Sequence, residues 1–235
     1  MKLFLARIQD NTALITSDEA HHMHRVLRLD QGDEVFVTDG KGLIFKGIIQ
    51  SLDSKVAVVS SLNQIENFQK RNYKIEIAVA PTKQIDRIEY LLEKAIEIGL
   101  DGFFPMITFH SERRKINHDR LERIALSAMK QSLKADLTQI HPLMTFEEII
   151  HQNLDASCHQ FIAHCHPDIE VYPIKSVINS NQSYRFLIGP EGDFSKEEVQ
   201  QAIKLGYTPV SLGNQRMRTE TAALSCVMLT HFLHI

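Results

Sequence analysis

The sequence contains no tryptophan and only three cysteines, Cys158, Cys165 and Cys226. An odd number of cysteines in no paired spacing excludes a disulfide framework and favours a reducing compartment. No apolar run approaches the roughly 18 residues that a membrane span needs. The start, MKLFLARIQD, has too few apolar residues before Arg7 for a signal peptide. We therefore expect a cytoplasmic protein that has no membrane partner.

Several motifs of common enzyme classes are also missing. No G-x-G-x-x-G follows a predicted strand, which argues against a dinucleotide-binding fold and against the usual glycine loop of methyltransferases. A P-loop and a G-x-S-x-G elbow are absent as well. The group Cys158, His164, Cys165 and His166 fits no zinc-ligand spacing, so we expect no metal.

The charge balance excludes a generic polycation. The chain of 235 residues has 26 Lys and Arg against 29 Asp and Glu, a net charge of −3 with neutral histidines. Any affinity for nucleic acid must therefore come from a local basic patch. Apolar residues make up 43% of the chain, which is enough for one large or two modest domains.

The first part of the chain is rich in short β-type runs. VFVTDG, LIFKGIIQSL and KVAVVSSL predict strands, and Asp39–Gly42 between the first two predicts a hairpin loop. A helical turn is expected at HHMHRVLRL. Strands this short and this close, without a crossover helix, indicate a small β-barrel over residues 1–68, with 63–72 as a polar linker.

From residue 73 to residue 235 the pattern alternates between strands and helices. Such alternation predicts an α/β domain with a mostly parallel sheet and helices on both faces. Capping-box patterns at Thr145 and Ser195 mark two helix starts, and Gly99 fits a helix end. The predicted strands are 75–80, 103–108, 160–165, 185–189 and 209–213, and the main helices are 84–99, 119–134, 196–205 and 219–233.

Three of the predicted strand ends carry unusual loops, 161–167, 187–195 and 211–222. Parallel sheets bind ligands at the carboxyl ends of their strands, so we expect these three segments to converge on one pocket. Gly189 and Gly192 allow a close approach of the backbone. A single loop of this kind is more often a simple connection between a strand and a helix.

Two motifs in these loops are specific when taken together. LIGPEGDFS (187–195), followed by SLG (211–213) and RMRTETAA (216–223), closely resembles the RsmE family of bacterial 16S ribosomal RNA methyltransferases, within the SPOUT superfamily. The resemblance extends over nearly the whole chain. Further matching residues are His22, Arg25, Val26, Leu27, Arg28, Gly32, Asp33, Lys83, the run KAIEIGL (94–100), Ser111, Glu112, Arg113 and Gln131.

The resemblance implies a fold and an activity. The carboxy-terminal domain is expected to carry a SPOUT-type trefoil knot, the amino-terminal domain to be a PUA- or OB-like barrel that holds RNA, and the chain to form a homodimer. The expected reaction transfers a methyl group from S-adenosylmethionine to N3 of a uridine in 16S rRNA of the small ribosomal subunit. The expected cofactor-binding residues are Ile162, Ala163, His164, Leu187, Ile188, Gly189, Pro190, Glu191, Gly192, Leu212, Gly213, Met217, Arg218, Thr219, Thr221 and Ala222.

Two residues of the last motif are candidates for catalysis. Uracil N3 becomes a good nucleophile only after it loses its proton, and a cation near O2 or O4 would stabilise the resulting anion. Arg218 is the candidate for this cation, and Glu220 is a candidate proton acceptor, directly or through water. A carboxylate in the first turn of a helix is also favoured for purely structural reasons.

A basic run lies in the middle of the chain. Residues 112–134 hold seven Lys and Arg against three Asp and Glu. Clustered positive charge of this kind either contacts phosphates or forms a solvated surface. The residues expected to contact RNA are Arg25, Arg28, Lys83, Arg113, Arg114 and Lys134.

The chain departs from the common family pattern at two places. Asp193 stands where many members have glycine, and Gln215-Arg216 replaces a frequent Arg-Ile pair. Two other functions remain as alternatives. One is an RNA-binding or ribosome-assembly protein without activity, and the other is a small-molecule α/β enzyme that uses the helix start after GPEG as an anion site.

Overall fold

The computed structural model describes residues 2–16, 18–153, 157–180 and 182–234. The chain forms two compact units, one of residues 1–70 with 126–137 and the other of residues 71–125 with 138–235. The chain thus passes between the units within the expected linker region. Residues 126–137 belong to the first unit, although the helical pattern placed them in the second domain.

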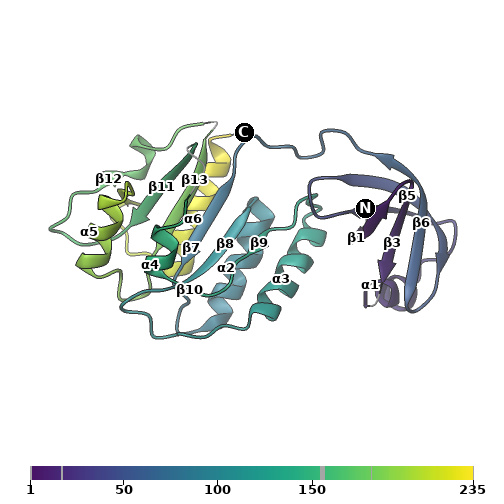
Figure 1. Ribbon diagram of the computed structural model, residues 1–235, viewed down its shortest axis with the longest axis horizontal. Coiled ribbons are helices and arrows are strands. Elements are labelled where there is room, and N and C mark those ends of the chain that lie inside the picture. Colours follow the sequence, from purple (N-terminus) through teal and green to yellow (C-terminus); the bar gives the residue numbers. More distant parts are fainter. Residues whose placement is uncertain (1, 17, 154–156, 181, 235) are drawn as a thin grey trace. The chain divides into compact units, whose positions relative to one another are not determined.

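The first unit is a six-stranded curled sheet around its own core (Figure 1). Its strands are β1 (Leu3–Leu5), β2 (Arg7–Gln9), β3 (Thr12–Thr16), β4 (Glu34–Thr38), β5 (Ile44–Leu52) and β6 (Val56–Gln64). The order in the sheet is β1-β4-β5-β6-β3-β2, and the helical turns α1 (Asp18–His21) and η1 (His22–Val26) follow β3. This is the half-barrel form of the barrel predicted for this region.

Local sequence signals explain the strand pairing of the first unit. Val35 and Val37 alternate with the less buried Glu34 and Phe36 along β4, so one face of the sheet is apolar. The loop between β4 and β5 closes when the Asp39 carboxylate accepts the N–H groups of Lys41 and Leu43. The predicted hairpin is therefore confirmed. Strand β6 continues to Gln64, two residues into the segment predicted as linker.

Residues 126–137 complete the first unit from far along the chain. They include the last part of α3 (His118–Gln131) and the turn after it. The Thr38 hydroxyl donates to the Ala135 carbonyl at 2.8 Å, and Ala135 packs against Leu3 and Ile44. Lys130 and Glu19 form an ion pair in the same unit. These contacts explain why the segment groups with the curled sheet.

The second unit is built on an eight-stranded parallel sheet. Its order is β10-β8-β7-β13-β11-β14-β12, and β9 also pairs with β8. The strands are β7 (Ile75–Val79), β8 (Gly102–Ile107), β9 (Gln139–Ile140), β10 (Met144–Thr145), β11 (Cys158–Ala163), β12 (Tyr172–Pro173), β13 (Ser183–Ile188) and β14 (Thr208–Ser211).

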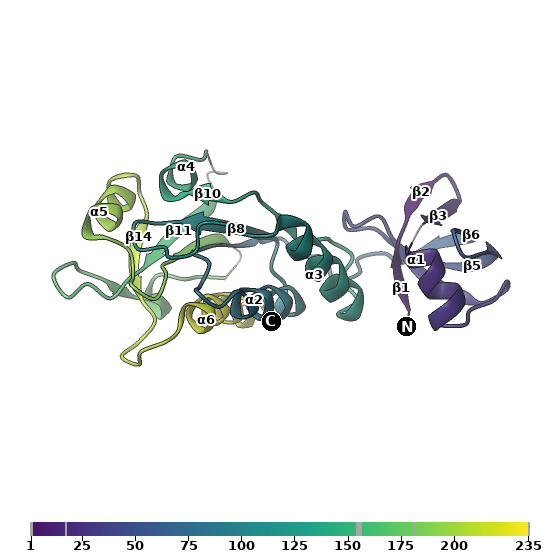
Figure 2. The same ribbon diagram turned by 90° about the horizontal axis from the view of Figure 1, so that it is seen from below.

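Helices cover both faces of this sheet (Figure 2). One layer contains α2 (Ile85–Ile98) and α6 (Thr219–Phe232), and the other contains α4 (Phe146–Ile150) and α5 (Lys196–Lys204), while η2 (Ile174–Ser176) is a short 3-10 turn. The predicted α/β class and the parallel sheet are confirmed. Among the described residues, no helix combines the length and the apolar character that crossing a membrane would require.

The helix starts predicted at Thr145 and Ser195 and the helix end predicted at Gly99 are confirmed, whereas α3 ends at Gln131, three residues before the predicted end. Thr145 and Ser195 each accept the N–H group of the glutamate three residues later, and both capping boxes are complete. Gly99 ends α2 at a φ of +133°, a conformation that L side chains rarely adopt.

A proline within a strand pattern usually argues against a central strand. Pro105 nevertheless lies inside the buried strand β8. The carbonyls of Asp101 and Phe103 bond to the side of β9, so the missing N–H of Pro105 falls on that side as well. On that side no strand pairs with Pro105 itself, because β9 pairs with residues 102–103 and β10 with residues 106–107. The proline therefore costs no bond of the ladder.

Candidate functional site

Three neighbouring strands of the second unit end at the same edge of the sheet. β11 lies between β13 and β14 and runs parallel to both, so the loops after these strands lie together. They enclose a cavity of about 740 Å³. Cys165, Gly189 and Gly213, one from each loop, all line it, so the predicted convergence is confirmed.

Most of the residues expected at this pocket line it. They are Ala163, His164, Ile188, Gly189, Pro190, Glu191, Gly192, Leu212, Gly213, Met217, Thr219 and Ala222. The cavity therefore combines apolar side chains, backbone groups of glycine-containing loops and the first turn of α6. This mixture of an apolar wall with a few polar groups is typical of small-molecule sites.

Four of the expected residues do not line the cavity. Ile162 and Leu187 point to the other face of the sheet, where they pack in the core with α4 and α5. Successive residues of a strand face opposite sides, so Ile188 can contribute to the cavity and Leu187 cannot. Arg218 and Thr221 are exposed at the start of α6 but are outside the lining.

Other lining residues were not expected from the sequence. Ile169, Val171 and Val210 add apolar surface, and Asn214 and Arg216 add polar groups. Asn214 and Arg216 lie inside the segment 211–222, so the prediction that this loop borders the pocket could have identified them. Ile169 and Val171 follow an irregular segment without periodicity, and no pattern marks them. The remaining lining residues belong to the three loops predicted to converge but were not among the expected cofactor contacts; they are Cys165, His166, Pro167, Asp193, Ser211 and Gln215.

Asp193 ties two of the three loops together. Its Oδ2 accepts the N–H of Cys165 at 2.7 Å, and its Oδ1 accepts the N–H of Phe194 at 2.8 Å. The residue has a φ of +63°, a left-handed conformation that aspartate tolerates better than most side chains. In the same region, His166 Nε2 and the Phe194 carbonyl are 2.8 Å apart. The loop after β11 and the loop after β13 are thus held at a set spacing.

The third loop is connected to the second through α6. The Thr219 hydroxyl donates to the Gly189 carbonyl at 3.0 Å. Arg218 is the N-cap of α6 and makes no side-chain cap bond. The first N–H groups of a helix have no partner within the helix, so they remain available beside the cavity.

Two ionisable groups of the cavity lining, His164 and Cys165, are biased toward their neutral forms by burial. Burial lowers the pKa of His164, which favours its uncharged ring. Burial, with the nearby Asp193 carboxylate, raises the pKa of the Cys165 thiol. Since the thiolate is the reactive form of cysteine, Cys165 is not an activated nucleophile. This argues against covalent catalysis by that residue.

Glu220 faces α2 and does not line the cavity. Its Oε1 lies 3.8 Å from Arg87 Nε on α2. Its Oε2 is buried and has no hydrogen-bond partner among the described residues. The structure therefore places neither catalytic candidate in the lining of the pocket.

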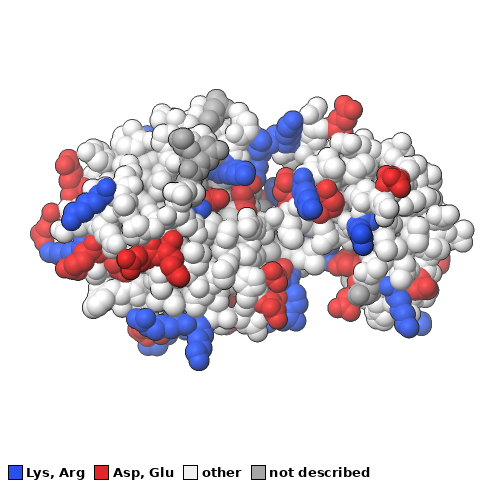
Figure 3. All heavy atoms as spheres, in the orientation of Figure 1, with Lys and Arg blue, Asp and Glu red and all other residues white. Residues whose placement is uncertain are grey.

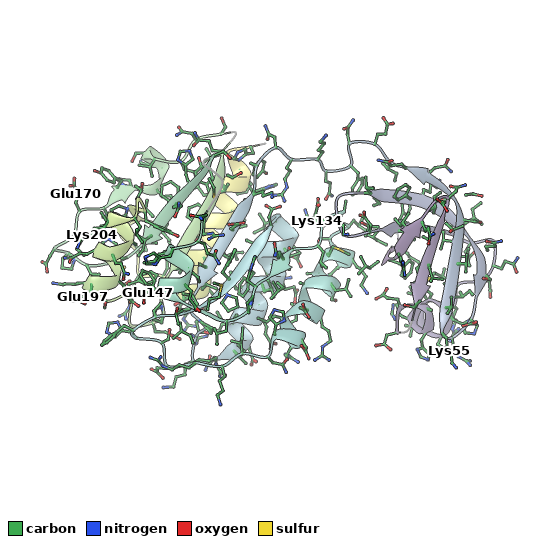
Figure 4. All side chains as sticks on the ribbon, viewed as in Figure 1. Lys55, Lys134, Glu147, Glu170, Glu197 and Lys204 are labelled. Carbon is green, nitrogen blue, oxygen red and sulfur yellow. The ribbon has the colours of Figure 1, made fainter. Side chains whose placement is uncertain are left out.

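The residues expected to contact RNA differ in their exposure and in their bonds to other groups of the protein. Arg25 and Arg28 are exposed in the first unit, and Arg114 is exposed in the second. Lys83 pairs with Glu112 at 3.0 Å. Arg113 donates to the carbonyls of Thr82 at 3.1 Å and Lys83 at 2.8 Å, so it positions the loop after β7. Lys134, labelled in Figure 4, is partly buried.

One group of side chains could hold a metal ion outside the cavity. Among the described residues, His118, Asp119 and Glu122 bring potential ligand atoms within 4.8 Å of one another at the start of α3. Two of them are exposed, and none lines the cavity.

Comparisons with known proteins place this geometry in context. Residues 69–231 match the family model described as "RNA methyltransferase domain", and residues 15–60 match the one described as "RNA methyltransferase PUA domain". A curated relative from Bacillus subtilis, Ribosomal RNA small subunit methyltransferase E, is 23% identical over 91% of this chain and 87% of its own length.

Solved structures agree with these matches. A crystal structure described as a probable rRNA-methyltransferase from Porphyromonas gingivalis is 40% identical, with a TM-score of 0.89, over 100% of this chain and 98% of that one. A Ribosomal RNA small subunit methyltransferase E from Neisseria gonorrhoeae, bound to S-adenosyl methionine, is 22% identical, with a TM-score of 0.85, over 100% of this chain and 98% of that one. The similarity to the Neisseria gonorrhoeae structure is one of fold.

Proposed function

This chain belongs to the RNA methyltransferase family, and from that membership we propose that it methylates N3 of a uridine in 16S rRNA of the small ribosomal subunit, with S-adenosylmethionine as methyl donor. The observation that carries the proposal is the cavity itself. The two family motifs lie in two of the three loops that line it. Its volume of about 740 Å³ lies within the range for sites that enclose a small ligand.

The residues of the cavity suit the proposed donor. Ile188, Leu212 and Met217 can contact the adenine, and the backbone of the glycine-containing loops can hydrogen-bond to its edge. Glu191 and Asp193 place carboxylates in the lining, which favours a ligand with positive charge. When bound, S-adenosylmethionine supplies an activated methyl group, so the protein must mainly hold donor and acceptor in line.

The proposed catalytic residues are Arg218 and Glu220. Arg218 is exposed between Met217 and Thr219, both of which line the cavity, and its guanidinium can stabilise the uracil anion. Glu220 has an unpartnered carboxylate oxygen among the described residues, but it faces Arg87. We therefore assign Glu220 the role of proton acceptor through a water molecule.

RNA binding is proposed for both parts of the chain. Residues 1–68 are the proposed RNA-binding PUA-like domain, with Arg25 and Arg28, and residues 73–235 are the proposed SPOUT methyltransferase domain. Lys83, Arg114 and Lys134 are further proposed phosphate contacts. For Arg113 the loop-positioning bonds favour an indirect contribution. A cytoplasmic location and a trefoil-knotted path complete the proposal.

A homodimer is also part of the proposed function. Helix α6 is apolar around most of its surface and leaves Met228, Phe232 and Leu233 exposed. A helix that is apolar all round is normally buried. Pairing of two copies through α6 would remove these side chains from water.

The decisive experiment uses small ribosomal subunits from a strain that lacks the gene. Purified protein and labelled S-adenosylmethionine are expected to restore N3-methyluridine at the position that lost it, as mapped by mass spectrometry. Saturating S-adenosylmethionine is expected to stabilise the protein, by about 2.7 kcal/mol at 100 times its Kd. If the same uridine stays methylated after deletion, the substrate assignment is wrong.

Two variants of Arg218 test its role separately from the substrate. Arg218→Ala is expected to lower kcat by about 100-fold, the lower end for loss of a group that stabilises an anionic transition state. Arg218→Lys keeps the positive charge and is expected to retain part of the activity. The affinity for S-adenosylmethionine, measured by calorimetry, should change little in Arg218→Lys. An Arg218→Ala enzyme with normal kcat would show that the uracil anion needs no cation from this residue.

A further inference from the structure

A tight turn after β8 exposes two aromatic rings beside the cavity. The Ser111 N–H donates to the Thr108 carbonyl at 3.1 Å, and the Thr108 N–H donates to the Ser111 hydroxyl at 2.9 Å. Thr108 and Ser111 are both buried. Phe109 and His110 are therefore the two central residues of a turn whose base is fixed within the protein.

Contacts with the chain after β13 hold the tip of this turn in place. The Phe109 N–H donates to Glu198 Oε1 at 2.8 Å, and His110 Nδ1 lies 3.1 Å from the Asp193 carbonyl. A Cβ atom on Gly192 would lie 3.1 Å from the Cβ of His110, so only glycine permits this approach without displacement. Because Gly192 and Asp193 line the cavity, the turn lies directly behind two of its lining residues.

Phe109 is exposed although its backbone is well anchored. Its side chain is 71% exposed, whereas Phe232 is the only other exposed phenylalanine among the described residues. The His110 ring lies against it edge to face, with centroids 5.0 Å apart and an angle of 80°. The exposed Phe109 ring contributes little to the hydrophobic core. Because the turn holds its backbone in place, the ring is preorganised to stack on a flat partner such as another aromatic ring.

We propose that Phe109, supported by His110, is a stacking platform for an unpaired base of the RNA substrate, next to the nucleotide that receives the methyl group. The inference rests on the proposed function. An enzyme that acts on a ring atom of a base needs that base unstacked, and its neighbours then lose a stacking partner. Aromatic side chains replace such partners without regard to sequence.

The charges around the turn favour RNA as the occupant. Arg114 and Lys115 are exposed a few residues further along the chain. Figure 3 shows Lys and Arg side chains at the lower edge of the second unit, along which the chain after β8 runs in Figure 1. Asp and Glu side chains gather instead over α4 and α5, which include Glu147 and Glu197. A phosphate backbone is attracted to the edge that carries Lys and Arg and repelled by the acidic surface over α4 and α5.

Four variants separate stacking from general apolar contact. Phe109→Ala and Phe109→Leu remove the aromatic face, and Phe109→Trp keeps one. Leu205→Ala, on an exposed apolar side chain after α5, is the control. The substrates are unmodified small-subunit rRNA transcribed in vitro and small subunits from the deletion strain. The measurements are the Kd for RNA, KM and kcat for methyl transfer, the Kd for S-adenosylmethionine and Tm.

Loss of the ring is expected to weaken RNA binding and raise KM by about tenfold, as for a lost base–aromatic stack. Phe109→Trp should bind RNA as well as the wild type or better. Tm and the affinity for S-adenosylmethionine should stay unchanged in all four variants. An unchanged Kd and KM in Phe109→Ala, with an active wild type, overturns the platform alone. A Leu variant as good as the Trp variant also overturns it. Failure of the wild type to bind or methylate either RNA overturns the proposed function as well.

Discussion

At the scale of single residues, the cavity depends on side chains that bridge loops rather than on isolated reactive groups. Asp193 accepts hydrogen bonds from Cys165 and Phe194, and Thr219 bonds to Gly189. The Asp193–Cys165 bond joins residues 28 positions apart along the chain, and the Thr219–Gly189 bond joins residues 30 positions apart. A substitution at such a position is therefore expected to change the shape of the pocket as well as the stability of the protein.

The first prediction concerns Asp193. Asp193→Ala removes a charge-assisted hydrogen bond and leaves alanine at a left-handed φ, so we expect the free energy of unfolding to fall by about 2 kcal/mol. Asp193→Asn tolerates this φ but keeps only one of the two acceptor oxygens, so it should lose less stability than Asp193→Ala. Asp193→Gly relieves the strain but lacks the acceptor, so it should be intermediate. Urea denaturation and calorimetry with S-adenosylmethionine measure both effects. Equal stability of the Ala and Asn variants would contradict the bridging role.

The second prediction concerns pH. Burial lowers the pKa of His164 and of His141, whose ring stacks on Phe104 with centroids 3.7 Å apart. In the unfolded chain both rings take up protons near the ordinary histidine pKa of about 6.5, whereas the folded protein resists this. The free energy of unfolding should therefore fall as the pH is lowered from about 7.5 to 5.5, across that value. His141→Phe keeps the stack and should lose less stability over this range. An identical pH dependence of the two proteins would rule out a contribution from His141.

At the scale of elements, the two capping boxes differ in the contacts that their glutamates make beyond the helix start. Both α4 and α5 begin with a complete box. The box of α4 uses Glu148 to bond the Thr145 at its start. In α5, Glu198 bonds Ser195 through Oε2 and also accepts the Phe109 N–H through Oε1. The start of α5 therefore joins a helix, a cavity loop and the turn after β8.

This difference leads to the third prediction. Glu148→Ala and Glu198→Ala should each cost about 1 kcal/mol of stability for the lost cap. Only Glu198→Ala should also release the turn 108–111, seen as faster hydrogen exchange of the Phe109 amide and a higher KM for RNA. Glu148→Ala is thus the matched control. Equal exchange at Phe109 in both variants would mean that the turn holds its position without α5.

At the scale of the whole molecule, the arrangement of the chain explains why distant motifs act together. Parallel pairing of β13, β11 and β14 brings three loops to one edge of the second unit. The first unit takes residues 126–137 from the middle of the chain, so neither unit is one continuous segment. The outer surface of α6 is the remaining large-scale feature, because it leaves apolar side chains in water.

The fourth prediction tests this surface. Phe232, at 58% exposure, is the most exposed apolar side chain of α6. If two copies pair through α6, Phe232→Glu should weaken the dimer by about 2 kcal/mol or more, as expected at an interface hot spot. Ile203→Glu, on the exposed side of α5, should have no effect. Sedimentation equilibrium measures the association. A monomeric wild type, or an unaffected Phe232→Glu dimer, would exclude this surface as the interface.

Local patterns alone were sufficient for much of the fold. The strand at 75–80, the α2 helix with Gly99 at its end and both capping boxes follow from interactions between residues a few positions apart. The three loops could be placed at one edge because the carboxyl ends of parallel strands coincide. The family motifs then pointed to the same loops. These features are readable because their causes are close together in the sequence.

The tertiary structure alone determined which side chains face the cavity. A strand buried on both faces is apolar throughout, so its pattern does not show that Ile188 faces the pocket while Leu187 faces the core. The direction of Glu220 depends on Arg87 of another helix, and the place of Ala135 depends on Thr38, 97 residues earlier in the chain. Contacts over such separations form only when the whole chain has packed, and no local pattern encodes them.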